Sequence, residues 1–184
     1  MRWGLGIGVA VLLGCESPPV STATVRTVSG PTQFAARSAG LFLIPTQFNG
    51  TPVTEMVLLL HERDSACQAS DAPISRKLLL EVTRIPPHTV GPGEYRSGPT
   101  EGLASVEWLR GQYQEVRADC ELTHQETDAH LSLSRFDIGA AAGTLEIRLD
   151  DGTEIAGEFT ALACPTEPVV VPGANEALPT CGQR

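Results

Sequence analysis

The residues of this chain best suited to chemistry are its four histidines and the carboxylates near them. His61 and Glu62 begin the His-Glu-x-x-His pattern of a zinc-binding helix, but Ser65 stands where the second histidine is required. Val57, Leu59 and His61 share one face of a strand-like apolar run. We therefore expect His61 at the rim end of a strand and not in a metal site.

His124 and His130 flank two acidic residues, Glu126 and Asp128. Imidazole and carboxylate groups at such short spacing can hold a metal ion or exchange protons. A polar loop between two strands accounts for the same residues, and we favour that interpretation. We accordingly expect neither a metal site nor a cofactor in this chain.

The patterns of common hydrolases and nucleotide-binding proteins are missing. The chain has no Gly-x-Ser-x-Gly nucleophile motif and no Gly-rich phosphate loop between a strand and a helix. Trp108 and Tyr113 could form an exposed stacking platform for a sugar, although aromatic residues in strands more often pack in the core or across strands. We expect no catalytic residues and a protein that is not an enzyme.

The first fifteen residues have the parts of an export signal. Arg2 precedes a short apolar run, residues 3–13, which falls below the roughly 20 residues that a membrane-spanning helix needs. Leu12-Leu13-Gly14-Cys15 resembles the lipobox of bacterial lipoproteins. The resemblance implies cleavage before Cys15, attachment of lipid to its sulfur, and a protein held on a membrane of the cell envelope. Glu16 stands where an Asp would signal inner-membrane retention in many Gram-negative lipoproteins, which favours the outer membrane in such a cell.

With Cys15 assigned to lipid, four of the five cysteines remain: Cys67, Cys120, Cys164 and Cys181. An even number in an oxidising compartment predicts disulfides, and no pair has the Cys-x-x-Cys spacing of a zinc or redox site. Four cysteines allow three connectivities. Among these we prefer Cys67–Cys120 with Cys164–Cys181, the pairing that joins neighbours along the chain.

Two late segments alternate apolar and polar residues with a period of two, which indicates half-buried strands. Residues 145–149 form the first, residues 155–161 the second, and Asp150-Asp151-Gly152-Thr153 between them predicts a tight hairpin. With a similar alternation just upstream, residues 129–163 are predicted to form a three-stranded meander. Gly143 to Cys164 also resembles a segment of β-rich bacterial envelope lipoproteins that have no assigned activity.

Further apolar runs lie upstream, each bounded by turn residues; they are residues 39–44, 55–62, 77–85, 103–109, 112–118 and 129–136. The best helix candidate is short, residues 64–75. We therefore predict an all-β fold, a single antiparallel β-sandwich or barrel-like domain of eight or nine short strands. The expected divisions are a signal peptide (1–14), a flexible, disordered tether (15–32), the β-domain (33–165) and a Pro-rich tail (166–184).

The formal charge of −9 argues against a nucleic-acid partner. We expect a monomeric, exported, lipid-anchored envelope protein whose β-domain presents a binding or structural surface to an unidentified envelope protein or glycan. The alternative is a lipocalin-like carrier of a small ligand, although the Gly-x-Trp of that family is missing near the first strand. A hydrolase ranks third. A wide apolar cavity would favour the carrier, and a filled core would argue against it.

Overall fold

The computed structural model describes residues 21–48, 50–64, 66–67, 75–97, 107–165 and 180–181. Within these ranges all regular structure is β-strand, which confirms the predicted all-β class. The ten strands exceed the predicted eight or nine. They are β1 (Thr22–Ala23), β2 (Arg26–Ser29), β3 (Ser38–Phe48), β4 (Thr51–His61), β5 (Ser75–Arg84), β6 (Gly93–Arg96), β7 (Glu107–Val116), β8 (Glu121–Asp137), β9 (Ala140–Leu149) and β10 (Glu154–Ala163).

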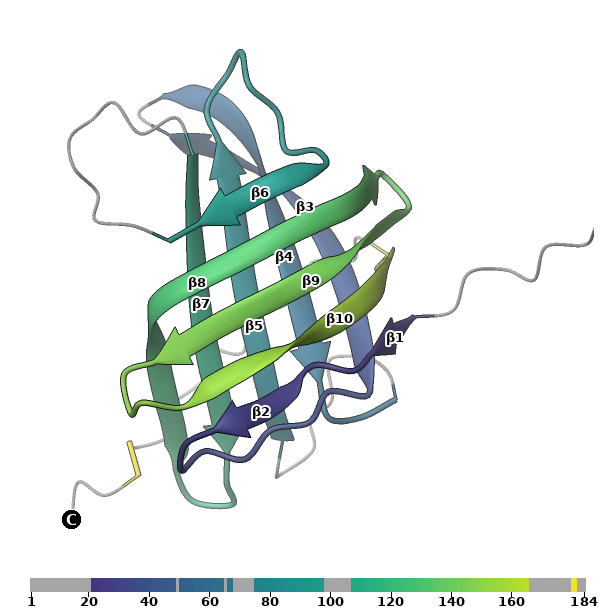
Figure 1. The fold of residues 1–184 in the computed structure, drawn as a ribbon. Coiled ribbons are helices and arrows are strands. Elements are labelled where there is room, and N and C mark those ends of the chain that lie inside the picture. Colours follow the sequence, from purple (N-terminus) through teal and green to yellow (C-terminus); the bar gives the residue numbers. More distant parts are fainter. Residues whose placement is uncertain are drawn as a thin grey trace, which may run out of the picture.

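Seven of the strands close into a barrel. β3, β4, β5, β7, β8, β9 and β10 follow one another as antiparallel neighbours, and β10 returns to β3 (Figure 1). Because the number is odd, the closing pair is parallel, and it joins Leu162 to Gly40 and Ala163 to Leu41. Of the two architectures that the sequence left open, the pairing is that of the barrel, not of a separate two-sheet sandwich.

Strand β8 forms the corner of the barrel. Its first residues pair with β7, and from Glu126 onward it pairs with β9. The register shifts between Glu126 and Asp128, as expected of a β-bulge that bends a strand into a second layer. In Figure 1, β6, β8, β9 and β10 consequently cross in front of β3, β4, β5 and β7.

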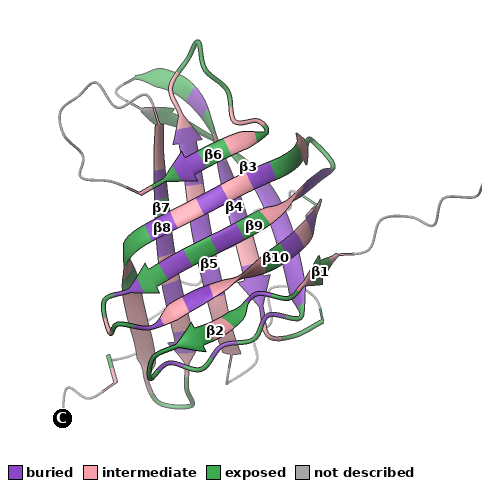
Figure 2. Ribbon diagram, viewed as in Figure 1, coloured by how far each residue is buried: buried purple, intermediate pink, exposed green. Residues whose placement is uncertain are grey.

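The interior of the barrel is filled by side chains. Buried and more exposed residues alternate along the barrel strands (Figure 2), as expected where every second side chain points inward. Leu80 of β5, Leu131 of β8 and Leu145 of β9 are among the buried residues. Among the described residues, Tyr95 and Tyr113 are the largest fully buried side chains. Each fully buried Leu stabilises the fold by about 1.5–3 kcal/mol, so this packing supplies the main driving force for folding.

The N-terminal strands lie against the barrel, which corrects the predicted tether boundary. β1 and β2 both pair with β10, and Val25 between them is completely buried. Residues 21–32 therefore belong to the β-domain and not to the tether. These two strands could not be predicted from the apolar pattern, because short strands with a single buried residue between them show no alternation.

The predicted meander over residues 129–163 is confirmed as β8, β9 and β10, with Gly152 at a φ of 82° in the hairpin turn. The predicted run 39–44 ends too early, because β3 continues through Pro45 to Phe48. β3 has no β10 partner beyond Leu41, and a proline nitrogen is tolerated at such an edge.

The runs 103–109 and 112–118 are not two strands: of the described part of this region, residues 107–118, residues 107–116 form the single strand β7. Most of the helix candidate 64–75 lies outside the described residues. Of its described positions, Ala66 and Cys67 form a turn and Ser75 begins β5.

Two disulfides join all four cysteines predicted to form them, but the preferred pairing was wrong. The bonds are Cys67–Cys164 and Cys120–Cys181. Cys164 follows β10 at the seam with β3, and the turn after β4 brings Cys67 to the same place. Residues close in sequence are thus not the ones close in space. Cys15, the proposed lipid attachment residue, lies outside the described residues, as does the signal peptide.

Candidate functional site

His61 is the last residue of β4, which confirms its predicted place at a strand end. Only 6% of it is exposed, and its Nδ1 accepts a hydrogen bond of 3.0 Å from the Arg63 amide. Burial lowers the pKa of the imidazole, and the nearby charges of Arg63 and Lys77 lower it further. His61 is therefore a buried, neutral residue that ends a strand.

His124 and His130 both lie on strand β8, so the predicted polar loop at this position is wrong. His130 Nε2 lies 2.5 Å from Glu94 of β6, whose other oxygen accepts a hydrogen bond of 2.7 Å from Ser132. The hydrogen bonds from Ser132 and His130 lower the pKa of Glu94. This pair lies on the outer surface, where the Glu94 side chain is 60% exposed.

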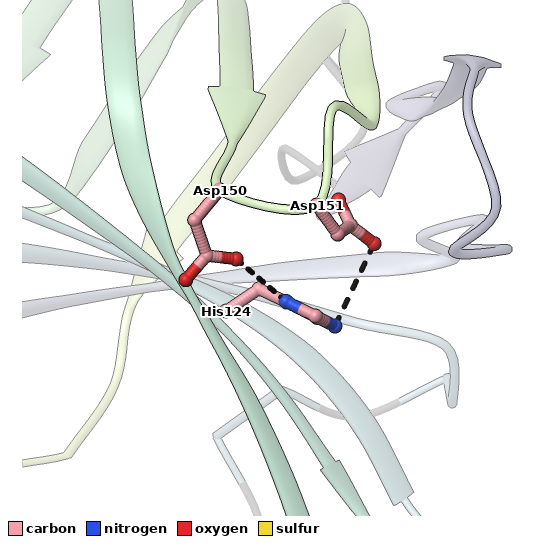
Figure 3. Close-up of side chains that lie close together, drawn as sticks. All are labelled: His124, Asp150 and Asp151. Atoms are coloured by element: carbon pink, nitrogen blue, oxygen red, sulfur yellow. Dashed lines mark hydrogen bonds and ion pairs between the residues drawn. The ribbon is translucent and has the colours of Figure 1, made fainter.

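His124 has different partners, two carboxylates of the β9–β10 hairpin (Figure 3). Its Nδ1 lies 2.6 Å from Asp150 Oδ1, and its Nε2 lies 3.5 Å from Asp151 Oδ2. We refer to His124, Asp150 and Asp151 as the His124 cluster. The neighbours that the sequence suggested for His124, Glu126 and Asp128, are not part of it.

Backbone pairing between β8 and the hairpin places Asp150 in the cluster. The Asp150 amide donates to the Gln125 carbonyl at 2.9 Å, and the Gln125 amide donates to Asp150 Oδ2 at 3.3 Å. Because Gln125 directly follows His124, these two bonds fix the carboxylate beside the imidazole. The Asp150 side chain remains 48% exposed.

Asp151 is held more tightly and is less exposed. Its Oδ2 accepts a hydrogen bond of 2.6 Å from the Thr32 hydroxyl, and its Oδ1 accepts one of 2.8 Å from the Thr153 amide. Burial opposes the charged form, but the hydrogen bonds from Thr32 and Thr153, together with the charge of His124, keep the pKa of Asp151 below its ordinary value. Asp151 is thus a fixed, ionised carboxylate.

Tyr113 of β7 lies directly across from His124, and the two rings stack with centroids 6.2 Å apart. Tyr113 is fully buried and also contacts Phe34 edge-on, with centroids 5.9 Å apart. The sugar platform suggested for Trp108 and Tyr113 is therefore absent, and the core interpretation of Tyr113 is confirmed. Trp108 lies five positions away on the same strand and faces the other side of the sheet.

Beneath Tyr113, a charged network surrounds the buried carboxylate of Glu115. That carboxylate accepts a hydrogen bond of 3.1 Å from the Tyr113 hydroxyl and ion-pairs with Arg117 at 2.7 Å and with Arg76 at 3.4 Å. Burial alone would raise the pKa of Glu115, but these hydrogen bonds and charges lower it. The same burial and the adjacent carboxylate raise the pKa of the Tyr113 hydroxyl, so Tyr113 stays protonated.

Comparison with models of known protein families, with curated proteins and with solved structures finds no match to this chain. Within the described residues, the structure contains no helix with the length and apolar character needed to cross a bilayer. The chemistry of the site therefore has to be argued from its own geometry.

The sequence missed the partnership of His124 with the hairpin. The sequence assigned Asp150 and Asp151 only to a tight turn, and the turn is confirmed. One signal was present: a tight Asp-Gly turn needs only one aspartate, so the second was available for another role. Of the described titratable residues, only the members of the His124 cluster bring three metal-binding side chains within ligand distance of one another.

Proposed function

We propose that this protein is an exported lipoprotein of the bacterial cell envelope, anchored through Cys15, whose barrel is a non-enzymatic binding or structural domain. The observation that carries the proposal is the pair of disulfides, which uses every described cysteine. Disulfides of this kind persist in oxidising compartments outside the cytoplasm. The lipobox-like Leu12-Leu13-Gly14-Cys15 supports export to the cell envelope and lipid attachment at Cys15.

The anchor on Cys15 would consist of more than one acyl chain. A single chain gives only marginal, reversible binding, at about 0.8 kcal/mol per buried CH₂, whereas two or more hold a protein stably. The first described strand, β1, begins at Thr22 and pairs with β10, so only a few residues would separate the domain from the lipid. The domain would therefore work close to the membrane surface.

The carrier alternative loses support from the packing of the barrel. A lipocalin-like carrier keeps its ligand inside the barrel, yet here the inward positions hold leucines and the buried rings of Tyr95 and Tyr113. Binding would instead use the outside. Hollows lie on the outer face of β8, β9 and β10; one is lined by hydroxyl groups that include Ser132, Thr144 and Thr160.

Expression of the full chain with Cys15→Ser in a bacterial host tests the anchor. We expect the parent protein in the membrane fraction, with a lipid-sized mass increase on the peptide that begins at Cys15. The C15S variant should leave that fraction. Ser17→Ala, which keeps the lipobox, is the matched control and should behave like the parent. An unmodified Cys15 in membrane-bound protein, or membrane binding unchanged in C15S, would overturn the proposal.

A further inference from the structure

We propose that the His124 cluster binds one divalent transition-metal ion, with zinc as the representative ion, through His124 Nε2 and Asp151 Oδ2. The three side chains come from β8 and the β9–β10 hairpin, and one ligand atom from each lies within 4.8 Å of the others. The inference is independent of the anchor at Cys15.

The distances divide the cluster into ligands and supports. Two ligands about 2.0–2.2 Å from a tetrahedral zinc ion lie about 3.4 Å apart. His124 Nε2 and Asp151 Oδ2 are separated by 3.5 Å, which fits that spacing. His124 Nδ1 and Asp150 Oδ1 are only 2.6 Å apart, a hydrogen bond and too short for two ligands of one ion. Nε2 and Oδ2 therefore face the ion.

Asp150 then has the role of an orienting carboxylate. In metal sites a ligating histidine generally donates its other ring N–H to a carboxylate or carbonyl, which fixes the tautomer and makes the imidazole a better ligand. Asp150 holds Nδ1 in this way, and Figure 3 shows the ring lying between the two carboxylates. The hydrogen bonds from Thr32 and Thr153 fix Asp151 in a similar manner.

Burial distinguishes this cluster from an ordinary surface ion pair. The side chains of His124 and Asp151 are 17% and 15% exposed, so both are partly withdrawn from water. His130, which lies on the same strand as His124, pairs with only one carboxylate, that of Glu94 on β6, which is 60% exposed. His130 and Glu94 contact each other directly. His124 also faces Asp151, and the 3.5 Å between His124 Nε2 and Asp151 Oδ2 suits two ligands of one ion.

The donor set selects the class of ion. One imidazole nitrogen and one carboxylate oxygen suit zinc, copper or nickel ions better than calcium or magnesium, which prefer oxygen alone. With two protein ligands, the remaining positions fall to water or to a ligand from outside. Structural zinc sites have four protein ligands and catalytic zinc sites have three, so a site with two is more open than either and should exchange its ion readily.

Titration calorimetry with zinc sulfate tests the site on untagged protein first stripped with a chelator. The parent should bind one ion per chain. His124→Gln and Asp151→Asn should each weaken binding at least tenfold, and Asp150→Asn should weaken it by about 10–100-fold because it loses the orienting charge. His130→Gln is the matched control on the same strand and should bind like the parent.

A second measurement locates the ion and guards against misfolding. Amide chemical shifts should change on zinc addition at Thr32, Gln125 and Asp150 in the parent and in H130Q, and not in D151N. Far-UV circular dichroism and a thermal melt without metal would show whether each variant folds. Absence of zinc uptake by the parent, or equal uptake by folded D151N, would overturn the proposal.

Discussion

His61 and Glu115 are both buried and ionisable, yet their surroundings favour opposite charge states. Burial lowers the pKa of His61, and the nearby positive charges of Arg63 and Lys77 lower it further, so its neutral form is stabilised. Glu115 receives hydrogen bonds from Arg117 and Tyr113, so its charged form is stabilised. The protonation of each residue follows from which partners reach it and not from burial alone.

Because the pKa of His61 is lowered in the folded protein, we predict that the protein loses stability in acid. Above about pH 6.5, the ordinary pKa of histidine, the imidazole is neutral in both the folded and the unfolded chain, so His61 causes no loss of stability there. As the pH falls below that value, the unfolded chain takes up a proton that the folded chain resists. The free energy of unfolding should therefore decline from about pH 6.5 down through the folded pKa.

His61→Asn tests this because asparagine offers an acceptor for the Arg63 amide and does not titrate. Urea unfolding at pH 7.5 and pH 5.0 should show a smaller loss of stability in H61N than in the parent. Other groups titrate equally in both proteins, so the difference isolates His61. An equal loss in the two proteins would contradict the prediction.

At the scale of elements, Gly157 lets the N-terminal segment lie against β10. Gly157 has a φ of 153°, and a Cβ at this position would lie 2.6 Å from the Thr24 carbonyl oxygen. The Thr24 amide donates to the Glu158 carbonyl beside it at 2.9 Å. The absence of a side chain at one residue of β10 thus allows the connection between β1 and β2 to approach the sheet.

Gly157→Ala should weaken this attachment. Backbone strain from a positive φ amounts to about 1–3 kcal/mol, and the clash with Thr24 adds to it. Gly152→Ala is the matched control, since its φ of 82° is also positive but nothing lies within 4 Å of an added Cβ. Chemical denaturation should show a larger loss in G157A, with faster amide exchange in β2. Equal losses in the two variants would show that the close approach is unimportant.

At the scale of the whole molecule, the barrel is closed by little backbone pairing. β10 and β3 share only two register pairs, and the Cys164 amide adds one hydrogen bond of 2.8 Å to the Leu41 carbonyl. The Cys67–Cys164 disulfide lies at this seam and links positions 97 residues apart. Cys120–Cys181 instead fastens the C-terminal residues beside β8, where Thr180 bridges to Glu121.

Removal of each disulfide by paired serine substitutions should separate these roles. Both C67S/C164S and C120S/C181S should destabilise the protein by about 2–4 kcal/mol, because each frees a long loop in the unfolded chain. Only C67S/C164S should also accelerate amide exchange along β3 and β10. Faster exchange there in C120S/C181S, or unchanged exchange in C67S/C164S, would contradict the assignment of the seam.

The sequence predicted the features that depend on neighbours along the chain. The alternation of residues 145–149 and 155–161 around Asp150-Asp151-Gly152 specifies two strands and a tight hairpin, and His61 was correctly placed at a strand end. These features could be predicted because the side-chain period and the turn chemistry act within a few residues.

Tertiary structure decided everything that requires distant segments to meet. The curvature of the sheet and its register, which the bulge in β8 changes, decide which segments meet. They determine which cysteines pair, whether β10 returns to β3, and which carboxylates reach His124. His124 and Asp150 are 26 positions apart, and apart from the second aspartate of the turn no local pattern distinguishes them from surface residues. Local periodicity therefore determined the strands of this protein, and only closure of the barrel assembled its seam and its candidate metal site.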